Sequence, residues 1–279
     1  MENAQREEKK TRGPYIALLC ISLFIFLFIG PIVSITLTNA ASAYMRMHIP
    51  YILLFITFIA GSRFILKEPF ANLIVFQGKI RWKLVSISAL IYLLNSILCS
   101  LLFFSDIKWN GINLSAYLLQ LLPVIIITPL QALSEEILFR ALPLSIAYPG
   151  AKPRTIAKEL PFILFAGIIF TLPHLWNNEM YASAHPVLTA LCYFSWGMLA
   201  AFLSLETEGF EASSAMHAVN NLYIALIVNY DNSSMPTVAL FTSRQTGEVG
   251  TLIQTIAVFA LTYMILRRSG FIRKEASIG

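Results

Sequence analysis

Apolar residues fall into long runs along the chain, and short polar stretches separate these runs. A helix needs roughly 17–25 predominantly apolar residues to cross the hydrocarbon core of a bilayer. The pattern therefore predicts an all-α, polytopic integral-membrane bundle of about eight transmembrane helices, formed by a single domain over residues 1–279. The predicted spans are 14–38, 49–67, 83–105, 113–134, 159–176, 185–205, 212–230 and 250–267.

The apolar segment 137–147 follows the fourth span directly, and we expect it to extend that span into one long tilted helix. The first span follows a basic start, as a signal peptide does. Its apolar run from Tyr15 to Leu37 is longer than the usual 7–15 residues, so we expect this run to remain as an uncleaved helix.

The composition agrees with a membrane protein. The chain is 57% hydrophobic and 13% charged, whereas soluble proteins are roughly 45–50% apolar and about 25% charged. This excludes a disordered protein, a coiled coil and a disulfide-rich secreted module. The sequence contains no polar segment of domain size that could hold a nucleic-acid site. The predicted surroundings are the lipid bilayer, with no nucleic-acid partner.

The basic residues predict how the spans are oriented. With the N-terminus inside, 17 of the 20 Lys and Arg residues lie on the cytoplasmic side, if Arg140 is counted among them. The exceptions are Arg46, Lys108 and Arg244. An excess of Lys and Arg marks cytoplasmic loops. We therefore expect both termini to be cytoplasmic, with residues 1–13 forming a basic cytoplasmic tail.

Two adjacent carboxylates follow the fourth span. A charged side chain at the bilayer centre costs roughly 2.5–3.5 kcal/mol, so such residues usually mark a function. Glu136 and Arg140 are four residues apart, which favours an ion pair on one helix face. Glu135 points about 100° away and has no cation nearby in the sequence. Apolar surroundings without a nearby cation would make Glu135 a stronger base, which suits general-base catalysis near neutral pH. Alternatively, both glutamates mark a membrane boundary.

Two further polar segments lie in apolar runs. His174 ends the fifth span, with Phe170 one helical turn before it, and it either caps a broken helix or contributes to a site. His217 and Asn221 share a face of the seventh span, so we expect both to face the bundle interior, as a site or as interhelical hydrogen bonds. Asn220 is the competing neighbour of Asn221. The other two histidines, His48 and His185, fall in predicted external loops and receive no role.

Together these segments bring a carboxylate, two imidazoles and an amide toward one interior. Such groups can activate a water molecule and stabilise an oxyanion, which indicates hydrolysis of a peptide or amide bond.

The ordered set of motifs resembles the CPBP family of CAAX prenyl endopeptidases and bacteriocin-processing proteins, also called Abi proteins. The resemblance covers about residues 115–225, and it rests on three motifs: Glu135-Glu136-x-x-x-Arg140, Phe170-x-x-x-His174 and His217-x-x-x-Asn221.

The resemblance implies an eight-helix intramembrane glutamic protease in a membrane, and we expect the bacterial cell membrane. Glu135 with His174 would activate the attacking water, and His217 with Asn221 would stabilise the oxyanion. The structural residues that would support the site are Glu136, Arg140 and Phe170. The implied partner is a peptide or lipidated protein substrate within the membrane.

Other functions fit the same residues. The chain could be a non-catalytic CPBP-fold binding, scaffold or bacteriocin-immunity protein. A transporter could use these groups to move ions, although transporters often show two repeated halves, which this sequence lacks.

Within the enzyme hypothesis we predict no metal cofactor. The alternative is zinc bound by Glu135, His174 and His217 with Glu136 as base, but no His-Glu-x-x-His motif supports it.

One feature of the span count conflicts with a shared site. It places Glu135 near the cytoplasmic side and His174 near the outer end of the fifth span, and 14 helical residues would separate these levels by about 21 Å. We expect Glu135 to lie deeper, on the long helix that continues to Ala147.

Overall fold

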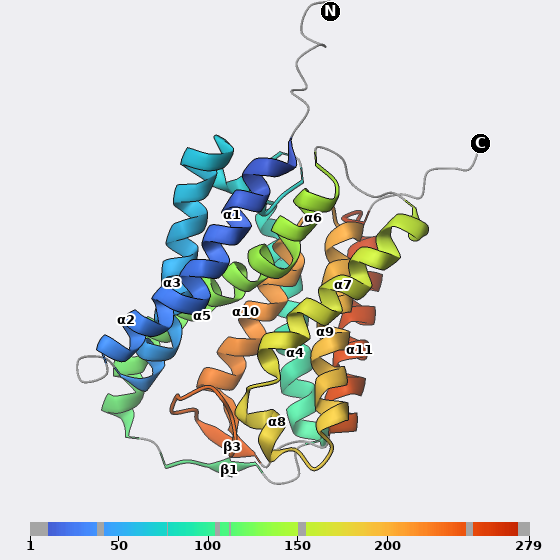
Figure 1. Ribbon diagram of the computed structural model, residues 1–279. Coiled ribbons are helices and arrows are strands. Elements are labelled where there is room, and N and C mark those ends of the chain that lie inside the picture. The colour runs from blue at the N-terminus through green and yellow to red at the C-terminus, as the bar shows by residue number, and fades with distance from the viewer. Residues whose placement is uncertain are drawn as a thin grey trace, which may run out of the picture.

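The computed structural model describes residues 11–37, 42–76, 78–103, 107–111, 113–149, 155–243 and 248–272. Residues 1–10 of the predicted basic tail lie outside the described residues, as does Arg244. The described chain forms a bundle of long helices with a small sheet at one end (Figure 1).

The elements follow the predicted order. Three short π-helical segments, Ile25–Ile29, Ser62–Leu66 and Ile137–Ala141, and one 3₁₀ turn, Phe70–Leu73, connect or interrupt the α-helices. The α-helices and strands are α1 (Arg12–Phe24), α2 (Gly30–Thr36), α3 (Ala43–Gly61), α4 (Trp82–Phe103), β1 (Lys108–Trp109), α5 (Leu114–Glu136), α6 (Leu142–Ala147), α7 (Ile156–His174), α8 (Asn178–Ala182), α9 (Pro186–Glu206), α10 (Glu211–Leu226), β2 (Val228–Tyr230), β3 (Phe241–Ser243) and α11 (Glu248–Arg268).

Seven helical segments of the described chain are long and apolar enough to cross a membrane. They match seven of the eight predicted spans, so the chain is an integral multi-pass membrane protein with an all-α fold. The segments are Arg12–Thr36, Ala43–Leu66, Trp82–Leu102, Leu114–Ala147, Ala157–His174, Pro186–Glu206 and Glu248–Arg268. The cytoplasmic location of the termini stays a prediction.

The remaining predicted span, 212–230, which is the seventh along the chain, differs from the prediction. It forms α10, which has only 16 residues, and then the strand β2. Helix α10 packs against α4 and α5 in the interior of the bundle (Figure 1). Neighbouring helices surround α10, so it can carry polar side chains that a lipid-facing helix would not tolerate.

The predicted long helix is confirmed. It runs without a break from Leu114 to Ala147, over 34 residues, and contains a π-helical segment at Ile137–Ala141. Pro143 follows this segment. A proline has no N–H, and its ring clashes with the carbonyl group four residues earlier. Here that residue is Phe139, inside the π-helical segment, where the wider turn accommodates the proline.

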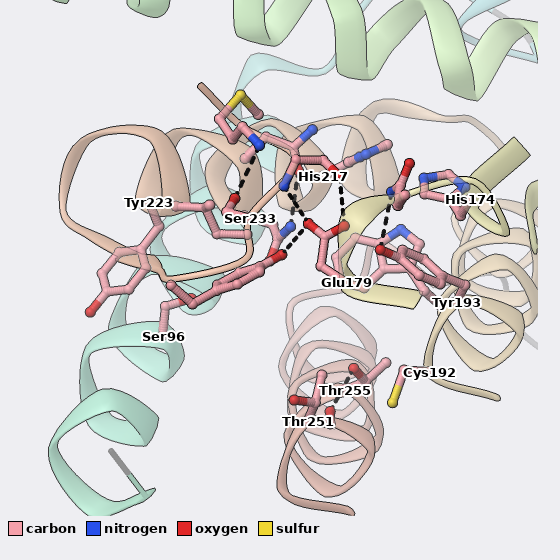
Figure 2. Close-up of a pocket in the computed structure, with 18 of the residues that line it drawn as sticks. Ser96, His174, Glu179, Cys192, Tyr193, His217, Tyr223, Ser233, Thr251 and Thr255 are labelled. Carbon is pink, nitrogen blue, oxygen red and sulfur yellow. Dashed lines mark hydrogen bonds between the residues drawn. The ribbon is translucent and has the colours of Figure 1, made fainter. Parts of the chain in front are cut away.

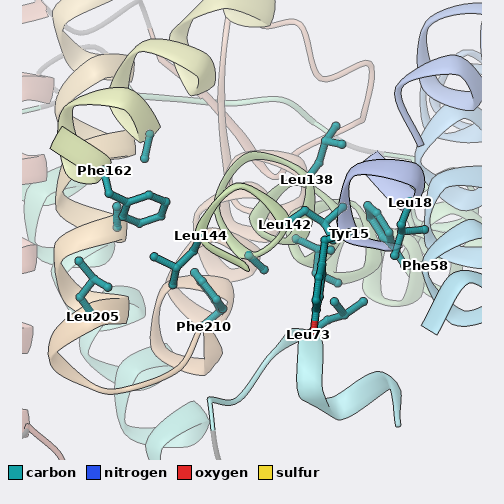
Figure 3. Packing of buried hydrophobic residues seen from close by; sticks show 14 of the residues in the cluster. Tyr15, Leu18, Phe58, Leu73, Leu138, Leu142, Leu144, Phe162, Leu205 and Phe210 are labelled. Atoms are coloured by element: carbon teal, nitrogen blue, oxygen red, sulfur yellow. The ribbon is translucent and has the colours of Figure 1, made fainter. Parts of the chain in front are cut away.

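Three clusters of buried apolar side chains hold the described helices together. The first joins α1 and α3 to the long helix, α7 and α9, through residues such as Leu18, Phe58 and Leu142 (Figure 3). Helices α7 and α9 lie close together at two glycines, Gly167 and Gly197. A Cβ atom on Gly197 would lie 2.8 Å from the Cα atom of Gly167, so a larger residue at position 197 would push the helices apart. Small residues allow such close packing between membrane helices.

A three-stranded sheet lies at the end of the bundle that also holds α8 (Figure 1). The strand order is β1-β3-β2, with β3 antiparallel to β1 and parallel to β2. No pattern of the sequence indicated this sheet. Its position beside α8 places polar loop residues over one end of the bundle interior.

Candidate active site

A cavity of about 370 Å³ lies inside the bundle and extends to the sheet. Its lining includes the four residues predicted to be catalytic, which come from three different helices: Glu135 on α5, His174 on α7, and His217 and Asn221 on α10. Phe170 also lines it. Figure 2 shows the part of this lining around His174 and His217. The fold therefore brings all five residues to one interior space.

Glu136 and Arg140 form the ion pair that their spacing predicts, which confirms that expectation. Both side chains are fully buried. Arg140 Nε also donates to the carbonyl oxygen of Gly197 at 3.4 Å, and its guanidinium carbon lies 4.6 Å from the centre of the Phe170 ring. Counting Arg140 with the cytoplasmic loop residues is wrong, because it lies in the long helix and contacts α7 and α9. It is a structural cation of the bundle interior.

The ion pair positions His217. His217 Nδ1 lies 3.2 Å from Glu136 Oε1, and His217 Nε2 lies 3.7 Å from Glu135 Oε2. Glu136 is a hydrogen-bond acceptor when ionised, so His217 Nδ1 carries a proton that it donates to Glu136. This bond directs the opposite nitrogen of the ring toward Glu135.

Glu135 differs from its neighbour in its surroundings, as expected from its different helix face. Its Oε1 accepts a hydrogen bond from Gln131 Nε2 at 3.1 Å. Its Oε2 is buried and has no hydrogen-bond partner among the described residues. Only 3% of the residue is exposed. A buried carboxylate oxygen without a donor is costly, and this one belongs to a residue that lines the cavity.

His174 is the last residue of α7. Its Nδ1 donates to the carbonyl oxygen of Phe170 at 2.6 Å, because a carbonyl oxygen can only accept. In the neutral ring, Nε2 is then free to accept a proton. The ring contacts those of Phe170 and Tyr193, whose centres are 4.5 Å and 4.4 Å away. Figure 2 shows His174 beside Tyr193. His174 and Glu135 share one cavity, so the conflict in the span count is removed by the long helix.

Asn221 and Asn220 have different contacts. Asn221 Oδ1 accepts from Asn220 Nδ2 at 3.0 Å, and Asn220 Oδ1 accepts from the hydroxyl of Tyr92 at 2.8 Å. Within the described part of the chain, no hydrogen bond from the amide nitrogen of Asn221 is present. Its two N–H groups can therefore serve a group that enters the cavity.

The predicted location of His48 in an external loop is wrong. His48 lies inside α3 rather than in an external loop, and it is fully buried. Its Nε2 lies 2.9 Å from Gln131 Oε1, which connects it to Glu135. The apolar run was assigned to start at residue 49, whereas the helix begins six residues earlier at Ala43. His185 precedes α9 and is exposed, as expected.

A second carboxylate of the cavity, Glu179 on α8, was also missed. It is 6% exposed and accepts hydrogen bonds from the Tyr230 hydroxyl at 2.7 Å and from the backbone and hydroxyl of Ser234 at 2.8 Å and 2.7 Å. Burial, together with this carboxylate, holds the pKa of Tyr230 well above its ordinary value, so Tyr230 remains a donor. Glu179 fixes the loop after β2 over the cavity (Figure 2).

In the described ranges, no group of three or more His, Cys, Asp or Glu side chains is placed to hold a metal ion. The predicted absence of a metal cofactor stays a prediction.

Residues 115–223 match the family described as "Type II CAAX prenyl endopeptidase Rce1-like". This range contains all three motifs.

One curated relative matches a larger part of the chain. A Bacillus subtilis (strain 168) protein named "Uncharacterized protein YyaK" is 28% identical over 201 residues, which cover 70% of this chain and 65% of that protein. The chain thus spans less than two thirds of that relative's length. No solved structure matches the chain. The family match over residues 115–223 includes all three motifs, and it confirms the family resemblance inferred from them.

Proposed function

We propose that the chain is an intramembrane glutamic endopeptidase of the CAAX type. It hydrolyses a peptide bond of a membrane-associated or lipidated peptide or protein. The observation that carries this proposal is the buried, unpartnered Oε2 of Glu135, which belongs to the same cavity as His174 and lies 3.7 Å from His217 Nε2. A general base needs such a free oxygen within reach of a water molecule.

In the proposed reaction, Glu135 and His174 take a proton from a water molecule, and the water oxygen attacks the carbonyl carbon of the substrate. Glu135 passes the proton taken from water to His217 Nε2, which lies 3.7 Å from its Oε2. The resulting oxyanion accepts hydrogen bonds from this N–H and from the Asn221 amide. The C–N bond then breaks, and the same proton moves to the leaving amine. Glu136 and Arg140 keep His217 oriented through the bond at Nδ1.

The proposal is tested by mass spectrometry of membrane peptides from cells that produce wild type or Glu135→Gln. A matched control is Glu208→Gln, which changes an exposed glutamate away from the cavity. We expect cleavage products with wild type and with the control, and none with Glu135→Gln. Identical peptides in all three samples, with retained biological activity, would instead favour a non-catalytic binding or immunity protein.

Asn221→Ala is expected to slow cleavage of a peptide substrate identified in that comparison by about 10²–10³-fold, because removal of one oxyanion donor has an effect of that size. The measurement is the initial cleavage rate of purified protein in lipid vesicles. Asn177→Ala is a suitable control, since Asn177 lines the same cavity and donates to Tyr193 rather than toward Glu135. Equal rates for Asn221→Ala and wild type would contradict an oxyanion role.

Purified protein is expected to contain no stoichiometric zinc. Among the described residues, no group of three or more His, Cys, Asp or Glu side chains is placed to hold a metal ion. Elemental analysis of protein purified without chelators measures the metal content. One zinc per chain that disappears in both His217→Ala and His174→Ala would overturn the metal-free mechanism.

A further inference from the structure

A hydrogen-bonded chain connects α3 to the proposed base. His48 Nδ1 lies 2.8 Å from the backbone carbonyl oxygen of Tyr44, and His48 Nε2 lies 2.9 Å from Gln131 Oε1. The other end of the same amide, Gln131 Nε2, lies 3.1 Å from Glu135 Oε1. All three side chains are buried: His48 is 0% exposed, Gln131 7% and Glu135 3%.

The donors and acceptors in this chain determine how many protons it holds. The carbonyl of Tyr44 only accepts, so His48 Nδ1 must carry a proton. His48 Nε2 faces the carbonyl oxygen of Gln131, which also only accepts, so Nε2 must carry a second proton. The ring is then an imidazolium, while Gln131 donates to an ionised Glu135.

Turning the amide by 180° gives the alternative arrangement. Gln131 would then donate to a neutral His48, and its oxygen would face Glu135, which would have to be protonated. If His48 were neutral and Glu135 ionised, two hydrogen-bond acceptors would face each other in either orientation of the Gln131 amide. The two acceptors would be His48 Nε2 and the Gln131 oxygen in one orientation, and the Gln131 oxygen and the Glu135 carboxylate in the other. A fully bonded chain therefore shares one proton between His48 and Glu135.

The orientation in the structure places this proton on His48. The other titratable groups beside His48 are Tyr44 and Tyr51 of its own helix, whose rings lie 4.0 Å and 6.3 Å away. The packed segment Ile25–Thr36 contains no residue that titrates.

We propose that His48, acting through Gln131, is the buried cation that keeps Glu135 ionised and oriented toward the cavity. His48 and Gln131 are positioning residues, because neither needs to touch the reacting atoms. The role in catalysis rests on the proposed function, whereas the shared proton does not. Glu135 therefore has a counter-ion from a helix 87 residues earlier in the chain.

The proton state of His48 can be measured without a substrate. The full chain, labelled with ¹⁵N-histidine and held in lipid bilayers at pH 7, is studied by NMR, and the His48 signals are those lost in His48→Gln. We expect both His48 nitrogens to be protonated in the wild type. In Glu135→Gln we expect one of them to lose its proton, because the new amide donates to Gln131 and no anion remains.

The matched control is Glu179→Gln, which changes another buried carboxylate of the same cavity without touching this chain. It is expected to leave the His48 signals unchanged. If Glu135→Gln fails to fold, Gln131→Leu gives a second test, because it removes the acceptor of Nε2 and should also produce a neutral ring. A neutral His48 in the wild type, or an imidazolium that persists in both variants, would overturn the proposal.

The enzymatic consequence is a change in the pH profile. In His48→Gln, ionisation of Glu135 loses its cation, so the acid limb of the cleavage rate is expected to move to higher pH. Below its midpoint, the rate falls about tenfold per pH unit with the ionised fraction of a base. A merely structural role would lower the rate equally at every pH. If the NMR signals are as expected but the protein cleaves no peptide, the proposed function is contradicted. The shared proton between His48 and Glu135 would still be supported.

Discussion

Glu135→Gln is expected to slow peptide cleavage by about 10²–10⁴-fold, the usual contribution of a positioned general base. The amide is nearly the same size as the carboxylate and can still bond Gln131, but it cannot accept a proton from water at neutral pH. The measurement is the initial rate of cleavage in vesicles, with a peptide identified from the membrane samples.

The fold of this variant should persist, because the amide keeps the shape of the carboxylate and its contact with Gln131. We therefore expect its unfolding temperature in detergent to stay close to that of the wild type. Glu208→Gln again serves as the control for both measurements. A wild-type cleavage rate in Glu135→Gln would remove the glutamate from the mechanism.

Arg140→Met is expected to destabilise the folded bundle by about 3–5 kcal/mol, because removing one partner of a buried ion pair leaves an uncompensated charge. Glu136 is fully buried and would lose this partner. His217 would remain its contact, so the orientation of His217 should change as well. Denaturation in detergent, followed by circular dichroism, measures the stability.

The control for this change is Arg63→Met, at an exposed position outside the cavity, where we expect an effect within about 0.5 kcal/mol. The double variant Glu136→Met with Arg140→Met should recover part of the loss, since apolar residues can replace a buried pair. If Arg140→Met is as stable as Arg63→Met, the pair does not hold the site together.

Local patterns of the sequence were sufficient for much of this fold. Apolar runs predict helices because each span must satisfy its backbone hydrogen bonds within itself, and seven such helices are present in the described chain. The pair Glu136 and Arg140 was predictable for the same reason, since both residues lie on one helix face four positions apart.

Contacts between distant segments were not predictable in this way. His48 meets Gln131 across 83 residues, and no local spacing indicates that α3 packs on α5. Helix α10 was assigned as a full span because its composition is apolar, although its polar face is shielded by α4 and α5. The strand β1 has two residues, too few to show an alternating pattern.

The π-helical segment Ile137–Ala141 also sets how α6 is rotated about the helix axis relative to α5. Glu135 and Glu136 precede it, while Leu142 and Leu144 follow it in the buried cluster that joins α1, α3 and α7. Each residue of a helix rotates the chain by about 100°. Loss of one residue from this segment would turn the glutamates relative to the buried leucines by that angle. The length of this short turn therefore decides which way the carboxylates face.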